Sequence, residues 1–293
     1  KAFTGLAALA YGFADTKRTW DCGGSWDGFD TGQPQMCWKH SGHGVLDFRG
    51  GVVNSCDVVF YDIGKQFFQA SKSQGGSISD TAMQDEIAKY GFGKKTGIDL
   101  GNIEEVGRIP TPEWRAEHFR DYPTEAVWKG GFNTNMAIGQ GDVLVTPLQM
   151  ARFYSAIAND GTLVTPHFLI SKPQSGDVAE WESEETGVDE TVLADMRSML
   201  RSVVTDGTGA AADIEGYEVC GKTSTAEIAS EEGGYKKEVY NIGFCGFIDN
   251  SSSNLVCFVG ANEVYAMRQT TQIFNDIMEN AVKQYNITSM PLN

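Results

Sequence analysis

The stretch Val219–Ala229, VCGKTSTAEIA, is the best starting point for interpreting this chain. Its valine and isoleucine predict a short strand, and side chains alternate between the two faces of a strand. Lys222 and Ser224 are therefore expected on one face, and Thr223 and Thr225 on the other. A lysine beside three hydroxyls suits an edge strand that lines a cleft for an acid or an acyl group. The same residues also fit a polar edge strand whose lysine prevents aggregation, so this stretch alone leaves both interpretations open.

The totals describe an ordinary folded protein. The chain has 293 residues, of which 41% are apolar and 21% charged, as is typical of a globular domain with a sizeable core. Its net charge of −16 argues against nucleic acid as a partner, because phosphate contacts require clustered Lys and Arg. No apolar run reaches the ~18 residues of a membrane span. The apolar start, KAFTGLAALAYGFA, predicts a buried helix rather than a signal peptide.

Helix caps and turn residues divide the chain into one mixed α+β domain. Residues 15–54 are predicted to be rich in loops, and an acidic exposed loop is expected over residues 172–187. The clearest helix is TPLQMARFYSAIANDG, with Thr146 as N-cap, Pro147 in the first position and Gly161 past the end. Further helices are expected over residues 54–68, 80–91, 189–204 and 266–285, and a hairpin over residues 241–263.

Three short stretches offer the groups that a serine acyl-transferase requires. They are Lys1 at the head of the first helix, Ser55-Cys56-Asp57 at the start of the next one, and Lys222-Thr223-Ser224. Such an enzyme needs a nucleophilic serine, a base, a proton relay and an anchor for an anionic substrate. The order of the stretches is similar to the S-x-x-K, S-D-N and K-T-G set of penicillin-binding proteins and class A β-lactamases.

On these motifs the chain resembles the transpeptidase domain of class B penicillin-binding proteins, most of all the elongation type. Further landmarks support the resemblance in order along nearly the whole chain: KAFTGLAALA, CWKHSGHGVLDFRGGVVNSCDVVFYDIG, GFGKKTGIDL, GRIPTPEW and AIGQGDVLVTPLQMARFYSAIANDG. The resemblance implies a penicilloyl-serine-transferase fold over residues 1–293. This fold has a five-stranded antiparallel sheet flanked by helices, together with a helical subdomain.

The resemblance also implies a reaction. A serine attacks the D-Ala-D-Ala bond of a peptidoglycan stem peptide, and the acyl group passes to an amine of a neighbouring strand. β-Lactams block the enzyme as a stable acyl-serine, and neither a metal nor an organic cofactor is required. A glycosyltransferase of the cell-wall machinery is the implied partner. The implied location is extracytoplasmic, on a single membrane anchor.

Carried over position by position, the resemblance gives each residue a role. Lys1 would be the general base, and Ser55 would bridge Lys1 and Lys222 and relay a proton to the leaving amine. Asp57 would orient the substrate or a lysine. Lys222, Thr223 and Thr225 would bind the terminal carboxylate, and the Thr225 N–H would be one oxyanion donor. Taken alone, however, Ser55 and Asp57 could simply cap a helix, and Lys1 is only the first residue of the chain.

Two departures from the family pattern matter. If Lys1 is the lysine of S-x-x-K, the nucleophilic serine is expected three residues before it, together with an upstream domain and the anchor. The third motif reads Lys-Thr-Ser instead of Lys-Thr-Gly, so Ser224 is expected to crowd the cleft. Three alternatives therefore stay open. They are a D,D-carboxypeptidase, a serine β-lactamase, and a non-catalytic penicillin sensor of the same fold.

The six cysteines form no C-x-x-C pair. Cys22, Cys37, His40 and His43 offer enough ligands for zinc, although zinc sites usually show a more regular paired spacing. A Cys22–Cys37 disulfide would fit an extracytoplasmic wall enzyme, and free thiols fit equally well. All three states remain open. Cys245 and Cys257 are expected to face each other if the hairpin turns symmetrically about Ser251, as two buried thiols.

Overall fold

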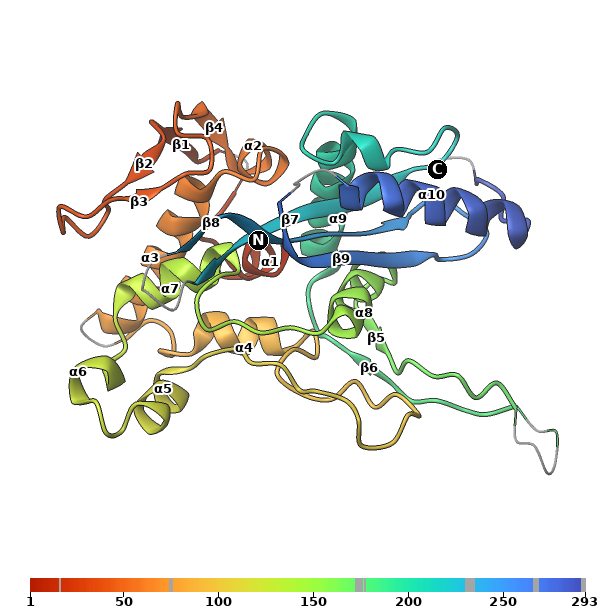
Figure 1. Cartoon of the computed structure of the whole chain (residues 1–293), viewed down its shortest axis with the longest axis horizontal. Coiled ribbons are helices and arrows are strands. Elements are labelled where there is room, and N and C mark those ends of the chain that lie inside the picture. Colours follow the sequence, from red (N-terminus) through yellow and green to blue (C-terminus); the bar gives the residue numbers. More distant parts are fainter. Residues whose placement is uncertain are drawn as a thin grey trace.

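The computed structural model describes residues 1–15, 17–73, 76–171, 176, 178–229, 235–265 and 269–290 (Figure 1). Helices and strands alternate irregularly along the chain, as the α+β prediction requires. The helices are α1 (Ala2–Ala10), α2 (Phe48–Val53), α3 (Asp57–Lys72), α4 (Ala82–Ala88), α5 (Pro112–His118), α6 (Pro123–Ala126), α7 (Gly130–Ile138), α8 (Pro147–Ala158), α9 (Glu190–Thr205), the 3-10 turn η1 (Ala210–Ala212) and α10 (Gln269–Gln284). The strands are β1 (Thr19–Cys22), β2 (Ser25–Trp26), β3 (Gln35–Met36), β4 (Gly44–Asp47), β5 (Thr162–Val164), β6 (Ser183–Glu185), β7 (Val219–Ala229), β8 (Tyr235–Ile248) and β9 (Val256–Val264).

Helix α1 lies at the centre of the molecule. Its residues from Ala2 to Ala8 are all buried, which confirms the prediction of a buried helix. Its surroundings are the aromatic side chains of Phe92 and Phe153, which contact Phe3, and Met196 of α9, which lies against Gly5. Because the helix is enclosed, the residue at its head is held at a fixed place inside the protein.

The main sheet is antiparallel in the order β7-β8-β9, so that β7 is an edge strand among the described residues. Residues Val219, Phe244 and Ile248 face a core that they share with α10, which lies along the strands in Figure 1. Cys220 and Cys245 face the opposite core, which contains α1, α8 and α9. The described part of this sheet has three strands, whereas the resemblance implies five.

The hairpin of β8 and β9 forms as predicted, but its register differs by one residue from the expected one. Cys245 pairs with Phe258, and Cys257 pairs with Gly246. A slip of one residue moves a side chain to the other face of a sheet. Cys245 and Cys257 therefore lie in different cores, and the prediction that they face each other is wrong.

The remaining chain forms helices and small sheets around this centre. Residues 15–54 contain the short pairs β1–β4 and β2–β3 and the helix α2, so this segment has more structure than predicted. The stretch expected to be a loop, residues 172–187, contains strand β6, which pairs with β5. Residues 172–175 and 177 of this stretch lie outside the described residues. Helices α3 to α7 form the helical subdomain (Figure 1). Across the described residues, no helix combines the length and apolarity needed to span a membrane.

The predicted helix over residues 146–161 illustrates how local sequence determines local structure. The Thr146 hydroxyl accepts a hydrogen bond from the Gln149 N–H at 3.1 Å, and the Gln149 side chain accepts one from the Thr146 N–H at 3.0 Å. This reciprocal pair is a capping box, which satisfies two N–H groups at the start of the helix. Gln149 also donates to the carbonyls of Lys94 and Val106. The cap thus attaches α8 to the neighbouring loop.

Candidate active site

Lys1, Ser55 and Asp57 meet at one point although 54 residues separate the first two. The Lys1 ammonium donates to Ser55 Oγ at 3.1 Å and pairs with Asp57 Oδ1 at 2.7 Å. Only 14% of the Lys1 side chain and 9% of the Asp57 side chain are exposed. A cation at the head of a helix is repelled by the helix dipole, whereas an anion there is favoured. Asp57, at the head of α3, therefore offsets the unfavourable position of Lys1 at the head of α1.

A tight corner between α2 and α3 presents Ser55 and Asp57. Helix α2 ends at Val53 with Asn54 as its C-cap, and Ser55 has a φ of +54°, a left-handed conformation that few residues other than glycine adopt. Strained backbone of this kind persists only where the surroundings fix it. One such fixing contact is the hydrogen bond from the Trp38 N–H to Asp57 Oδ2 at 2.8 Å. Asp57 is thus held at both oxygens, one by the Trp38 backbone and the other by Lys1.

Lys222 approaches the same site from the sheet. It lies on the face of β7 that is turned to the core containing α1, and 5% of the Lys222 residue is exposed. Burial, and after it the charge of Lys1, lower the pKa of Lys222 to about 7, while Asp57 acts in the opposite direction. Lys222 is therefore close enough to both residues to be influenced by their charges. Near neutral pH its ammonium and amine forms coexist.

The proposed bridge by Ser55 is only half present. Among the described residues, Ser55 accepts from Lys1, while the Lys222 ammonium donates to Thr223, at 3.3 Å to the carbonyl and 3.4 Å to the hydroxyl. The structure therefore shows the Lys1 half of the predicted bridge, and the relay by Ser55 between the two lysines stays a prediction. The Thr223 hydroxyl is also bonded to Thr208 at 2.8 Å.

The other two hydroxyls of the strand are accessible. Ser224 and Thr225 are exposed. Ser224 pairs with Gly243 of β8, and a Cβ placed on Gly243 would lie 2.8 Å from Ser224 Oγ. The absence of a side chain at Gly243 therefore makes room for the hydroxyl that stands where the family motif has glycine.

Comparison with known proteins identifies the family. Residues 1–279 match the family described as "Penicillin binding protein transpeptidase domain". The chain belongs to this family.

Two relatives and one solved structure show the extent of the similarity. Peptidoglycan D,D-transpeptidase MrdA of Acinetobacter baumannii is 31% identical over 198 residues, which cover 66% of this chain and 27% of the relative. Stage V sporulation protein D of Bacillus subtilis is 33% identical over 231 residues, which cover 77% of this chain and 32% of the relative. Penicillin-binding protein 3 of Mycobacterium tuberculosis, solved in complex with ampicillin, is 24% identical with a TM-score of 0.76, over 99% of this chain and 62% of that chain. The chain thus spans about a third or less of the two relatives, and the solved structure confirms the penicillin-binding protein fold.

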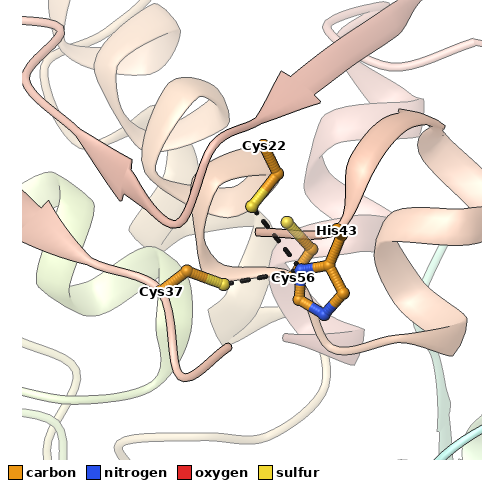
Figure 2. A group of neighbouring side chains, drawn as sticks. All are labelled: Cys22, Cys37, His43 and Cys56. Carbon is orange, nitrogen blue, oxygen red and sulfur yellow. Dashed lines mark hydrogen bonds between the residues drawn. The ribbon is translucent and has the colours of Figure 1, made fainter. Parts of the chain in front are cut away.

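A second group of reactive side chains lies beside the corner between α2 and α3. Cys22, Cys37, His43 and Cys56 bring their ligand atoms within 4.8 Å of one another. Figure 2 shows the three sulfurs and the imidazole pointing toward a shared centre, with dashed lines from His43 to two of the sulfurs. All six cysteines are free thiols in this structure, so a Cys22–Cys37 disulfide is not present.

The composition of this group differs from the expected one. His40 is exposed and does not belong to it, whereas Cys56, which sequence reasoning missed, does. Its position between Ser55 and Asp57 concealed it, because these neighbours drew attention to catalysis. The interaction with Cys56 lowers the pKa of Cys37, and the same interaction, together with burial, raises the pKa of Cys56.

Proposed function

We propose that the protein is a serine-type peptidoglycan D,D-transpeptidase that cross-links stem peptides and is acylated by β-lactams. The observation that carries this proposal is the meeting of Lys1, Ser55 and Asp57 within hydrogen-bond reach, with Lys222 buried on the face of β7 that is turned to the core containing α1. These residues come from the head of α1, the α2–α3 corner and an edge strand. Family membership of residues 1–279, and the transpeptidase name of the A. baumannii relative, support the same activity.

The chemistry starts at a serine expected three residues before Lys1, one helical turn from it on the same side of the helix. Its oxygen attacks the carbonyl carbon of the D-Ala-D-Ala peptide bond, and Lys1 takes the proton as general base. Ser55, at 3.1 Å from the Lys1 nitrogen, receives this proton from Lys1 and passes its own hydroxyl proton to the leaving D-alanine amine. An amine of a second strand then attacks the acyl-serine and releases the enzyme.

Strand β7 is proposed to bind the substrate. Protonated Lys222, with the hydroxyls of Thr223 and Thr225, attracts the terminal carboxylate, and the Thr225 N–H is one donor to the oxyanion. The edge position of β7 leaves backbone groups of this strand available to an extended peptide. Asp57 holds Lys1 in place through the 2.7 Å ion pair. No step of this scheme calls for a cofactor.

The setting of the domain is part of the proposal. Because cross-linking acts on glycan strands outside the cytoplasmic membrane, we place the domain on the extracytoplasmic side, with an upstream domain and a single anchor. A glycosyltransferase that makes those strands is the proposed partner.

Covalent labelling of the full-length protein with fluorescent penicillin tests the activity. We expect one adduct per chain by intact mass, and loss of labelling in Lys1→Gln, because glutamine cannot accept the serine proton. Lys17→Gln is the matched control, since Lys17 is exposed. Absence of any adduct after prolonged exposure would support a non-catalytic protein. Rapid release of hydrolysed penicillin would instead identify a β-lactamase, and transfer of the natural acyl group only to water a carboxypeptidase.

A further inference from the structure

An arm of the protein presents large apolar side chains to solvent. The arm is defined as residues 94–105, a loop before α5, together with residues 165–171 and 178–185, which continue β5 outward and return as β6. Figure 1 shows the β5 and β6 segments leaving the body of the molecule. The large apolar residues that are each between 46 and 76% exposed on the arm are Leu100, Ile103, Phe168, Ile170 and Val178. Apolar side chains gathered on an exposed surface mark an interaction site, whereas single exposed ones need no explanation.

Hydrogen bonds and a ring contact fasten the segments of the arm to one another. The Asp99 carboxylate of the loop accepts from the Phe168 N–H at 2.9 Å and from the Leu169 N–H at 2.8 Å. From the returning segment, the Trp181 indole N–H donates to the Leu169 carbonyl at 3.1 Å, and the Trp181 ring stacks on His167 with 4.8 Å between the ring centroids. The apolar side chains are thus attached to a backbone that is already held in place. A surface of this kind loses little conformational entropy when a partner binds.

Carboxylates accompany the apolar side chains along the arm. The residues of the arm include seven aspartates and glutamates and only two lysines. Glu105 of the loop and Glu180 and Glu182 of the returning segment are exposed. One ion pair, between Lys94 and Glu184 at 3.9 Å, offsets part of this negative charge. The arm therefore combines apolar contact area with a strongly negative surround.

This charge determines which kind of partner fits the arm. A second copy of the chain, whose net charge is −16, would bring the same carboxylates against these, and like charges that face each other weaken an interface. An anionic lipid surface and a nucleic acid are repelled for the same reason. A protein surface that joins apolar side chains to lysines and arginines complements both properties of the arm, because opposite charges steer the encounter and apolar contacts hold the complex.

We propose that the arm is the docking surface for a second protein, whose contact face joins apolar side chains to lysines and arginines. This inference goes beyond the proposed function and does not depend on it, because no residue of the arm has a role in acyl transfer. In Figure 1 the arm extends away from the N-terminus, where Lys1 lies. A partner bound to the arm would therefore leave the candidate active site open to its substrate.

Photo-crosslinking of the full-length protein in cells identifies the partner. A photoreactive amino acid is placed at Ile103 in one strain and at Ile170 in another, and the products are identified by mass spectrometry. We expect both positions to capture the same protein. Ile277 is the matched control, since it is an exposed isoleucine of α10 outside the arm, and should not capture that protein. The absence of a common product would overturn the proposal, as would products with a second copy of the chain, with another part of the same polypeptide or with lipid.

Binding of the captured protein to the purified full-length protein tests whether the arm provides the affinity. Phe168→Ser and Ile170→Ser should each raise the Kd about tenfold or more, because central apolar contacts dominate an interface, whereas Ile277→Ser should leave it unchanged. The Kd of the wild-type protein should also rise with salt concentration, which screens the attraction between opposite charges. Circular dichroism should show the same fold for all three variants, since the replaced side chains are exposed. A Kd that is the same for Phe168→Ser and Ile277→Ser, or that does not respond to salt, would overturn the proposal.

Discussion

Replacing Asp57 with asparagine, which exchanges one carboxylate oxygen for an NH₂ group, should lower the stability of the protein strongly. The carboxylate accepts from the Lys1 ammonium at 2.7 Å through Oδ1 and from the Trp38 N–H at 2.8 Å through Oδ2. An asparagine of the same shape has one oxygen and one NH₂ group. Both partners are donors, so one of them must face the NH₂ group and lose its acceptor.

The magnitude follows from the burial of the pair. Removing one partner of a buried ion pair costs roughly 3–5 kcal/mol, because the remaining charge stays desolvated. Asp57→Asn should therefore lower the free energy of unfolding by about that amount at pH 7. At about 2 °C per kcal/mol for a chain of this size, the melting temperature should fall by about 6–10 °C. Thermal unfolding followed by circular dichroism measures this change directly.

Asp62→Asn provides a control on the same helix. Asp62 also pairs with a cation, Arg18, but its side chain is 22% exposed and that of Arg18 is 38% exposed. Arg18, Trp20 and Gln66 all donate to Oδ2 of Asp62, so the amide oxygen of asparagine can still accept from them. The charge lost from an ion pair with this much solvent contact is worth about 0–1 kcal/mol. A melting temperature for Asp57→Asn within about 2 °C of the Asp62→Asn value would refute the reasoning that burial makes the Lys1–Asp57 pair costly to break.

Three further changes separate the roles of other residues. Lys222→Ala should lower second-order acylation by carboxylate-bearing lactams about tenfold to hundredfold, because a charge-assisted bond of roughly 1.5–3 kcal/mol is lost; an unchanged rate would make Lys222 structural. The protonated form of Lys222 binds the carboxylate, and the pKa of Lys222 is about 7. The acylation rate of the wild-type protein should therefore fall as pH rises above that value, and the rate of Lys222→Ala should not show this fall. Ser224→Gly should accelerate acylation by lactams with bulky substituents more than by small ones, and equal effects would show that Ser224 does not shape the cleft. Thr146→Ala should cost about 1 kcal/mol through loss of the capping box, detectable in urea unfolding, where no shift of the midpoint would contradict this role of the cap.

Features that depend on neighbouring residues were predictable from the sequence. The cap at Thr146, the burial of the first helix and the strand at Val219–Ala229 follow from caps, periodicity and strand-forming residues, and each is confirmed. The short pairs β1–β4 and β2–β3 were missed, since strands of two to four residues have too little pattern of their own. They form because the surrounding loops bring them together.

Features that depend on distant contacts were predictable only in part. The family motifs indicated that Lys1, Ser55 and Asp57 meet, but not that Lys222 donates to Thr223 rather than to Ser55. The register at Cys245 and Cys257 is the one already present in the pair next to the turn, Phe247 with Val256, so it depends on the length of that turn, which periodicity alone does not reveal. The contribution of Cys56 to the cysteine–histidine group depends on how residues 22–43 fold over the corner.

The distances along the chain between Lys1, the corner and Lys222 have a consequence for how the protein matures. Contacts between residues far apart in sequence form late, because the chain must first close long loops. A folding intermediate that lacks the sheet would have no Lys222 in the site, and one without the corner would lack Ser55 and Asp57 as partners of Lys1. Labelling by penicillin would therefore count only molecules that have completed folding. In a pulse-labelling experiment during refolding, the drug adduct would appear after helical structure and would serve as a clock for the last folding step.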